Sequence, residues 1–281
     1  LRINGKQNSI ACLQLSDEPD WVTHPQQVLL QDSIARNAYP YAPTMTTLCR
    51  NVTFFEYAPI VDLPCMDHYC VTAPSTSKWP FPYGTKLEET GYYTKDLKVA
   101  SEPKPIWVWS QGLFDWDERP NQTVPTPEEL AVQLVQNIGY GAKGILWFTF
   151  RKNPGMQYPE TRNAIREWGR VLRLTREDIL GSDPILHENI VSPANVDAMA
   201  LVNNNKLILC VTNKDYNMHQ NGYKFNMHKK TEIKISLPSW ISPKNIVNIL
   251  PQGIKEMECN YDNSGSLTIE IDNLRDAMVI V

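Results

Sequence analysis

Short apolar runs alternate with helical patterns along the first 180 residues of the chain, and this alternation restricts the possible folds more than any other feature. The runs are rich in apolar or β-branched residues and predict strands at Ile10 to Leu15, Thr44 to Cys49, Val61 to Asp67, Pro105 to Ser110 and Gly144 to Phe150. The stretches between them predict helices at Pro25 to Asn37, Phe54 to Ala58, Pro127 to Gly139 and Glu160 to Leu174. Because strands that alternate with helices pair in parallel, the pattern predicts an α/β fold on a parallel sheet.

The start of the third predicted helix carries several signals that agree with one another. Thr126 is a good capping residue, and Pro127 suits the first helical turn. Glu128 and Glu129 place negative charge at the positive end of the helix dipole. We therefore expect this helix to begin at Pro127.

The pattern changes after Gly181. The segments "VDAMALVN" and "KLILCVTN" flank three consecutive asparagines, Asn203 to Asn205, which is a hairpin signal. The segments "TEIKISL", "IVNIL", "SLTIEID" and "AMVIV" follow, with turn residues between them. The sequence thus predicts a small antiparallel β-sandwich over residues 190–281, joined by the linker Gly181 to Ile185 to a domain over residues 1–182.

Composition narrows the class of partner. The chain has 27 basic and 31 acidic residues, a net charge of −4 and no basic run, so binding to nucleic acid or to an anionic membrane surface is not indicated. It opens on Leu1 and shows neither a membrane-spanning stretch nor a signal segment. We expect a secreted or periplasmic protein that acts on a neutral molecule without a cofactor or a metal.

The six cysteines are expected to be thiols, because Cys12, Cys49 and Cys65 lie in or beside apolar runs.

Acids, amides and tryptophans occur where the predicted strands end. In a parallel sheet of βα units, functional side chains gather at the carboxyl ends of the strands. The candidates there are Asp17 and Glu18 after the first strand, Asp67, His68 and Tyr69 at the third, Trp107, Trp109 and Gln111 on the fourth, with Asp115 beyond it, and Trp147 and Arg151 on and after the fifth. Carboxyl and amide groups bind sugar hydroxyls, tryptophan rings lie against sugar C–H faces, and paired carboxyl groups break glycosidic bonds. The set therefore favours a carbohydrate.

Each candidate also has a structural explanation. Asp17 could cap the helix that follows it, and Asp67 could bond to loop backbone. Trp107 and Trp109 could fill the core, as aromatic residues commonly do. His68 could be structural, and Glu56 is expected to be a solvated surface residue.

Several segments, taken in order, resemble the C-terminal half of a (β/α)8-barrel glycoside hydrolase of the broad clan A-like group that includes β-galactosidase-like enzymes. They are "LQLSDEPD" (Leu13 to Asp20), similar to the acid-bearing end of barrel strand 4, "RNAYPYAPT" (Arg36 to Thr44), "IVDLPCMDHY" (Ile60 to Tyr69), similar to strand 6, "PIWVWSQGL" (Pro105 to Leu113), similar to strand 7, and "TPEELAVQLVQNIGYGAKGILWFTF" (Thr126 to Phe150). The resemblance covers residues 8–180. It implies a TIM barrel of which this chain supplies strands 4 to 8, with the N-terminal barrel half expected from the same longer polypeptide. The tail is similar to the small β-domains often appended to such barrels.

The resemblance implies roles for individual residues. Glu18 corresponds to the general acid/base, and Asp17 to an orienting carboxylate. Gln111 stands where many retaining relatives carry a nucleophilic glutamate, so either the nucleophile lies elsewhere, for instance at Asp67 or Asp115, or the mechanism differs. Some hexosaminidase families use a tandem Asp-Glu to steer the substrate's own acetamido group, which fits Asp17 and Glu18. The expected substrate-binding residues are Asp67, Tyr69, Gln111, Trp109, Trp147 and Arg151.

The leading hypothesis is therefore a glycoside hydrolase that acts on an oligosaccharide or polysaccharide. A barrel that binds carbohydrate without cleaving it is the main alternative, because Gln111 replaces a nucleophile. A purely structural module is the third possibility.

Overall fold

The computed structural model describes residues 10–71, 86–112, 124–148, 158–185, 187–204, 206–219, 222–237, 239–262 and 265–281. The chain forms two compact units, neither of them continuous in sequence. Unit 1 comprises Leu1–His68, Tyr92–Trp109 and Ala142–Leu146, and unit 2 comprises Tyr69–Gly91, Ser110–Gly141 and Trp147–Val281. The sequence boundary expected between residues 182 and 190 stays a prediction.

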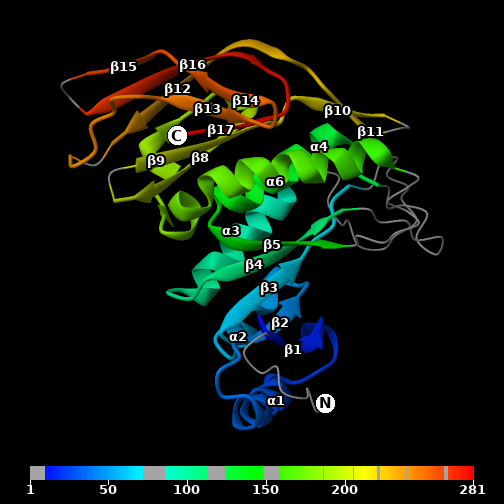
Figure 1. Cartoon of the computed structure of the whole chain (residues 1–281). Helices are drawn as coiled ribbons and strands as arrows, with labels where there is room; N and C mark the ends of the chain where they lie inside the picture. The colour runs from blue at the N-terminus through cyan, green and yellow to red at the C-terminus, as the bar shows by residue number, and fades with distance from the viewer. Residues whose placement is uncertain are drawn as a thin grey trace. The chain divides into compact units, whose positions relative to one another are not determined.

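A five-stranded sheet runs through the first half of the chain in the order β1-β2-β3-β4-β5, coloured blue to green in Figure 1. Its strands are β1 (Leu13–Asp17), β2 (Thr44–Leu48), β3 (Leu63–Asp67), β4 (Ile106–Gln111) and β5 (Ala142–Phe148). The pairs β1 with β2, β2 with β3 and β3 with β4 are parallel. The parallel sheet predicted from the alternating pattern is confirmed, and each strand end lies within three residues of its predicted position.

The helices between the strands are η2 (Pro19–Trp21), α1 (Pro25–Ala38), η3 (Asn51–Thr53), α2 (Phe54–Tyr57), α3 (Glu89–Ser101), α4 (Pro127–Gly139) and α6 (Pro159–Leu180). The sequence pattern did not predict α3. The reason is that Thr90, Thr94 and Ser101 are among its buried residues, so the apolar period that marks a one-sided helix is weak there. Helix α6 extends six residues beyond its predicted end at Leu174.

The core of unit 1 lies on one face of its strands. Leu48, Met66 and Val108 occupy matching register positions on β2, β3 and β4, and all three are fully buried. They pack in one cluster with residues of the covering helices, including Val28 of α1 and Phe54 of α2. The opposite face carries the intervening residues of the same strands, because side chains alternate along a strand.

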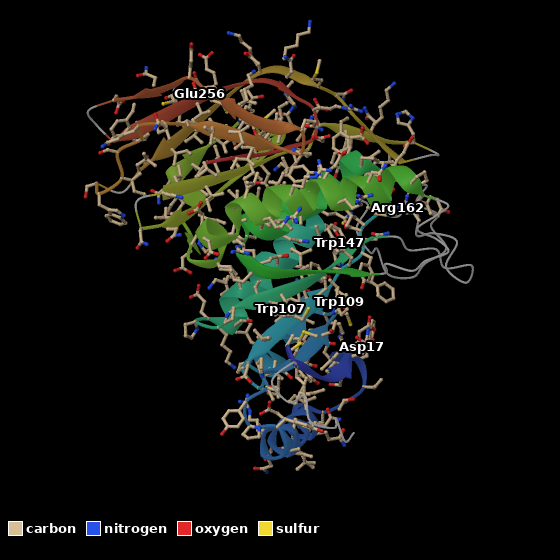
Figure 2. All side chains as sticks on the ribbon, viewed as in Figure 1. Asp17, Trp107, Trp109, Trp147, Arg162 and Glu256 are labelled. Atoms are coloured by element: carbon tan, nitrogen blue, oxygen red, sulfur yellow. The ribbon has the colours of Figure 1, made fainter. Side chains whose placement is uncertain are left out.

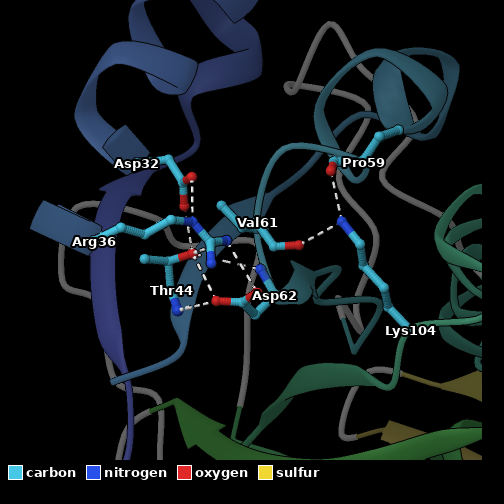
Figure 3. Close-up of polar contacts among 7 residues, drawn as sticks. All are labelled: Asp32, Arg36, Thr44, Pro59, Val61, Asp62 and Lys104. Atoms are coloured by element: carbon cyan, nitrogen blue, oxygen red, sulfur yellow. Dashed lines mark hydrogen bonds and ion pairs between the residues drawn. The ribbon is translucent and has the colours of Figure 1, made fainter. Parts of the chain in front are cut away.

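A polar network lies near the start of β2 and β3 (Figure 3). Asp32 of α1 is buried, accepts the Thr44 hydroxyl at 2.5 Å and pairs with Arg36 at 2.6 Å. Arg36 also pairs with Asp62 at 2.9 Å, and Lys104 donates to the Pro59 and Val61 carbonyls. Because each group has a partner, the network ties α1 to the amino ends of the strands, the end of a βα sheet associated with stability.

Two antiparallel sheets form a sandwich in unit 2, drawn from yellow-green to red in Figure 1. The six-stranded sheet contains, in spatial order, β14 (Gly253–Glu256), β13 (Val247–Leu250), β17 (Ala277–Ile280), β9 (Lys206–Asn213), β8 (Val196–Asn203) and β6 (Asp183–Pro184). The four-stranded sheet contains β15 (Cys259–Tyr261), β16 (Ser266–Leu274), β12 (His228–Ser236) and β7 (Ile190–Val191), and a separate pair contains β10 (Tyr216–His219) and β11 (Gly222–Phe225). A short 3-10 helix, η4, spans His187–Asn189. The predicted hairpin is confirmed, since Asn203 pairs with Lys206.

Alternate residues of the sandwich strands face its core. Val196, Ala198 and Ala200 of β8 face the same cluster as Ile233 and Ile235 of β12. The predicted linker differs from expectation, because Asp183 and Pro184 form the edge strand β6, which pairs with β8. Asp183 and Pro184 stand opposite Val202 and Leu201, and the Ile185 N–H donates to the Ala200 carbonyl at 2.9 Å, so this segment belongs to the sheet.

Helix α4 starts where its cap signals predict. Thr126 accepts the Glu129 N–H, and Glu129 in turn accepts the Thr126 N–H, so both form a capping box. Glu129 also accepts the Tyr223 N–H at 2.8 Å. The helix packs against β8, β9 and β17, and Gln136 donates to Asp197 and Thr212 there (Figure 1). These bonds satisfy polar groups that α4 would otherwise bury without partners.

Candidate active site at the strand ends of unit 1

Strand β1 contains a bulge that arranges its last residues. Gln14 pairs with Met45 and Asp17 with Thr47, so β1 uses one more residue than β2 over this stretch. Gln14 and Asp17 consequently lie on the same side, and Gln14 Nε2 donates to Asp17 Oδ1 at 3.3 Å. Strict alternation of side chains would have placed them on opposite faces.

Glu18 has the left-handed backbone conformation, with φ of 44° and ψ of 48°. Residues other than glycine rarely adopt this backbone conformation, and those that do are enriched at functional sites. Its N–H donates to the Thr47 carbonyl at 3.0 Å, which continues the β1–β2 pairing up to the turn. The helix that follows, η2, has no side-chain cap, so the alternative in which Asp17 caps it is wrong.

Asp20 holds the two neighbouring turns together. Only 4% of it is exposed, and its carboxylate accepts the N–H groups of Cys49 at 3.1 Å and Arg50 at 2.8 Å. The Thr53 hydroxyl also donates to it at 3.0 Å. These bonds fix the loop after β2 against the turn after β1, and therefore hold the backbone that carries Glu18. The sequence analysis did not single out Asp20 as a site residue, because its partners lie some 30 residues away.

Asp67, at the end of β3, lies within the electrostatic influence of the acids that end β1 and begin η2. Burial raises the pKa of Asp67 well above its usual range, and the negative charges of Glu18, Asp17 and Asp20 raise it further. Asp67 Oδ1 is buried and has no hydrogen-bond partner among the residues that the structure describes. Burial, reinforced by Asp20, Glu18 and Asp67, also raises the pKa of the nearby Cys49 thiol. Both burial and the neighbouring carboxylates therefore oppose ionisation of Asp67 relative to a free aspartate.

An aromatic wall adjoins these carboxyl groups. Trp109 is the register partner of Asp67, and its indole N–H donates to Thr47 Oγ1 at 3.1 Å. Trp107 lies two residues earlier on the same face of β4, against Gly144, where an added Cβ would be 2.6 Å from the indole. Figure 2 labels both tryptophans and Asp17 within unit 1. Both rings are partly exposed, so they are available as a surface as well as a support.

Other side chains near the strand ends have structural contacts. The His68 ring is buried and stacks on Tyr93 of α3, with ring centroids 4.0 Å apart. Trp21 is 40% exposed, and the Arg50 guanidinium lies over its ring at 5.2 Å. Trp21 was absent from the predicted set, although a tryptophan directly after "SDEPD" was a usable signal. Glu56 is exposed, as expected.

Three further predicted residues, Tyr69, Gln111 and Trp147, belong to unit 2. Gln111 is fully buried, and its amide donates to the Val71 carbonyl at 3.0 Å and accepts the Val71 N–H at 2.9 Å. These two hydrogen bonds fix the Gln111 side chain to the backbone of the segment after β3. Tyr69 stacks on Phe148, with centroids 5.4 Å apart.

Trp147 lies beside Gly112, whose N–H donates to the Phe148 carbonyl at 2.8 Å (Figure 2). Arg151 and Asp115 lie outside the described residues. All six cysteines are free thiols, as predicted.

The described part of the chain contains no group of three or more histidine, cysteine or acidic side chains placed to hold a metal ion. None of the described helices is both long and apolar enough to cross a membrane.

The chain was compared with known proteins. No family model matches it, and no curated protein matches it in sequence. Solved structures do match. A cycloisomaltooligosaccharide glucanotransferase from Paenibacillus sp. has a TM-score of 0.54 and 8% identity, over 91% of this chain and 58% of that protein. A GH30 endoxylanase from Clostridium papyrosolvens C71 has a TM-score of 0.55 and 13% identity, over 98% of this chain and 67% of that protein. The glycoside hydrolase family 30 subfamily 8 xylanase Xyn30A from Clostridium acetobutylicum has a TM-score of 0.50 and 12% identity, over 96% and 65%.

These matches show the fold of the chain. At 8 to 13% identity they indicate a glycoside hydrolase-like fold and carry no residue roles. The chain spans 58 to 67% of the length of the three proteins. The resemblance found in the sequence is supported at this coarser level.

Proposed function

We propose that the chain is a catalytic region of a glycoside hydrolase, with Glu18 as general acid/base and Asp17 as the orienting carboxylate. The observation that carries the proposal is the geometry at the end of β1. Glu18 has a left-handed backbone, follows Asp17 at the carboxyl end of a parallel sheet, and its negative charge contributes to the raised pKa of Asp67. Side chains at this end of βα strands are the ones that act on substrate in barrel enzymes.

The reaction requires Glu18 to give up one proton and later to take one back. Glu18 gives its proton to the glycosidic oxygen as the C–O bond breaks, and it takes a proton from the water that attacks the sugar. Asp17 would orient an acetamido group of the substrate, if one is present, or stabilise the positive charge that develops on the ring. Asp67 and Trp109 would contact the sugar from β3 and β4. Tyr69, Gln111, Trp147 and Arg151 remain predicted substrate-binding residues.

We also propose that further βα units cover the free edge of β1. Strand β1 pairs only with β2 among the described strands, and an open edge exposes unpaired backbone groups. Leu29, Leu30 and Ile34 of α1 are each more than half exposed. Such exposed apolar side chains suit a neighbouring helix. The preceding barrel strands of the same longer polypeptide are the proposed occupants.

A second function has one specific observation in its favour. Gln111 is buried against Val71 at the position where the resemblance expects a nucleophile. An amide cannot form a glycosyl ester, so a barrel that binds carbohydrate without cleaving it would also place an amide there. Glycan binding without turnover would identify this function.

Hydrolysis of a panel of aryl glycosides by the full-length protein tests the proposal. The panel contains N-acetylhexosaminides, galactosides, glucosides and xylosides, and compares wild type with Glu18→Gln. We expect cleavage of at least one class, with a loss of about 100-fold or more in kcat for Glu18→Gln, because a positioned acid contributes about 10²- to 10⁴-fold. The exposed Glu56→Gln is a control from the same unit and should retain wild-type kcat. Equal turnover by wild type and Glu18→Gln would refute the role of Glu18.

A further inference from the structure

A cavity opens into the core of the β-sandwich in unit 2. Its volume is about 520 Å³, and its walls come from β9, β13, β16, β17 and the segment between β12 and β13. Five of the lining residues also belong to the buried core cluster of the sandwich, namely Leu209, Ile246, Leu267, Ile269 and Ile280. The cavity is therefore continuous with the apolar interior of the sandwich.

A hollow of this size is unusual beside a folded core. Protein interiors are packed as closely as organic crystals, and few of their voids exceed one water molecule. Water is a poor occupant, because a buried water needs about two to four polar partners and these walls are mainly aliphatic. An apolar cavity of about 150 Å³ already holds benzene, and sites for small molecules measure about 300 to 1,000 Å³. The cavity thus has the size and the chemistry of a site for an apolar ligand.

The exposed rim of the cavity carries positive charge. Lys206 and Lys244 line it, and none of the described lining residues is an aspartate or a glutamate. Lys206 pairs with Asp178 at 2.8 Å, so an acid already compensates its charge. Lys244 is exposed and has no ion pair with any residue that the structure describes. An anionic group at the rim would therefore find its partner in Lys244.

Trp240 forms a large apolar surface at the same rim. Its side chain is 68% exposed, which is high for a tryptophan. Its indole N–H donates to the Asn204 carbonyl at 3.2 Å, so the ring is tied to the turn between β8 and β9. A ligand that leaves the cavity at this point would pass along a fixed aromatic ring.

We propose that this cavity binds an anionic amphiphile, with a linear alkyl chain in the apolar interior and a carboxylate head beside Lys244. The inner wall consists of leucine and isoleucine side chains, and a flexible alkyl chain adapts to such an irregular hollow. The charge of the rim selects an anionic head over a cationic one. The site lies within the sandwich and does not depend on the proposed hydrolase activity.

Isothermal titration calorimetry of the full-length protein with sodium decanoate, below its micelle concentration, tests the site. We expect saturable binding of one ligand per chain and a negative heat-capacity change, because the alkyl chain leaves water. Methyl NMR spectra then locate the ligand. The resonances of Leu209, Ile246 and Ile280 should shift, whereas those of Leu48 and Leu97 in the core of unit 1 should not.

Two substitutions test the interior and the rim separately. Leu207 of β9 lines the cavity and is partly buried, so Leu207→Trp should fill the hollow, abolish decanoate binding and keep or raise the melting temperature. Lys244→Gln should weaken decanoate binding about two- to fivefold, since an exposed ion pair contributes little, and should not change binding of the uncharged tetraethylene glycol monooctyl ether. Lys229→Gln, at an exposed lysine outside the cavity lining, is the matched control and should keep wild-type affinity.

Several results would overturn the proposal. The site is wrong if folded wild type shows no saturable binding of decanoate, or if folded Leu207→Trp binds it as tightly as wild type. If Leu207→Trp does not fold, Ile246→Phe fills the same cavity from the segment before β13 and takes its place. Equal affinities of wild type and Lys244→Gln for decanoate would overturn the anionic head. Decanoate binding by a protein that cleaves no glycoside would support the site and count only against the proposed function.

Discussion

Replacement of Asp20 by alanine should destabilise the turns that carry the candidate acid. Its carboxylate accepts the N–H groups of Cys49 and Arg50, and the Thr53 hydroxyl. The Thr53 hydroxyl also donates to the Arg50 carbonyl at 2.6 Å and so keeps a partner, but the two backbone N–H groups lose theirs. A buried donor without a partner costs about 1 to 3 kcal/mol, and bonds to a charged acceptor lie at the upper end. The free energy of unfolding should therefore fall by about 3 to 5 kcal/mol.

Urea denaturation measures this loss, followed by tryptophan fluorescence and by far-UV circular dichroism. At an m-value of about 1 to 3 kcal/mol/M, a loss of this size lowers the midpoint by about 1 M or more. Hydrogen exchange localises it, because the Cys49 and Arg50 amides should lose protection in Asp20→Ala. Asp20→Asn keeps one acceptor oxygen and should cost less. A midpoint for Asp20→Ala within about 0.3 M of wild type, with both amides still protected, would refute the reasoning.

Two further predictions concern packing and thiol reactivity. Gly144→Ala would place a Cβ 2.6 Å from the Trp107 indole, so the free energy of unfolding should fall by about 1 to 3 kcal/mol. Gly169 of α6 has no atom within 4 Å of the added Cβ, so Gly169→Ala should raise the free energy of unfolding by about 0.5 to 1 kcal/mol. Equal melting temperatures for the two variants would contradict this contrast. Cys259 is exposed, whereas burial raises the pKa of Cys210 to about 12. A thiol reagent at pH 8 should therefore label Cys259 in the native protein and Cys210 only after unfolding. Cys259→Ser should remove the fast phase of labelling.

Local signals predicted much of the fold. Helix α4 begins and ends at the expected residues, because the start signals of Thr126, Pro127 and Glu129 depend only on residues next to them in the sequence. The strands of the parallel sheet were found from short apolar runs, and the asparagine turn placed the hairpin. Helix α3 was missed and strand β6 was read as a linker, since a buried polar face and a two-residue strand leave no periodic pattern.

The candidate site was predicted less completely. Asp17, Glu18, Asp67 and Trp109 were named because they end predicted strands, and the structure brings them together in unit 1. The bulge in β1, the anchoring by Asp20 and the effect of the Glu18 charge on the pKa of Asp67 were not predicted. Each depends on a partner that is distant in sequence, and a single chain read in order does not reveal which distant groups meet.

By itself, the sequence determined that the chain builds a parallel sheet followed by an antiparallel sandwich, because hydrophobic period, caps and turns are local properties. It also placed acids and tryptophans at the carboxyl ends of the strands. Only the tertiary structure decided that Glu18 has a left-handed backbone, that Gln111 is held by Val71, and that Oδ1 of Asp67 is buried. The physical reason is that burial and the electrostatic field at a carboxyl group are sums over neighbours, and the fold alone selects those neighbours.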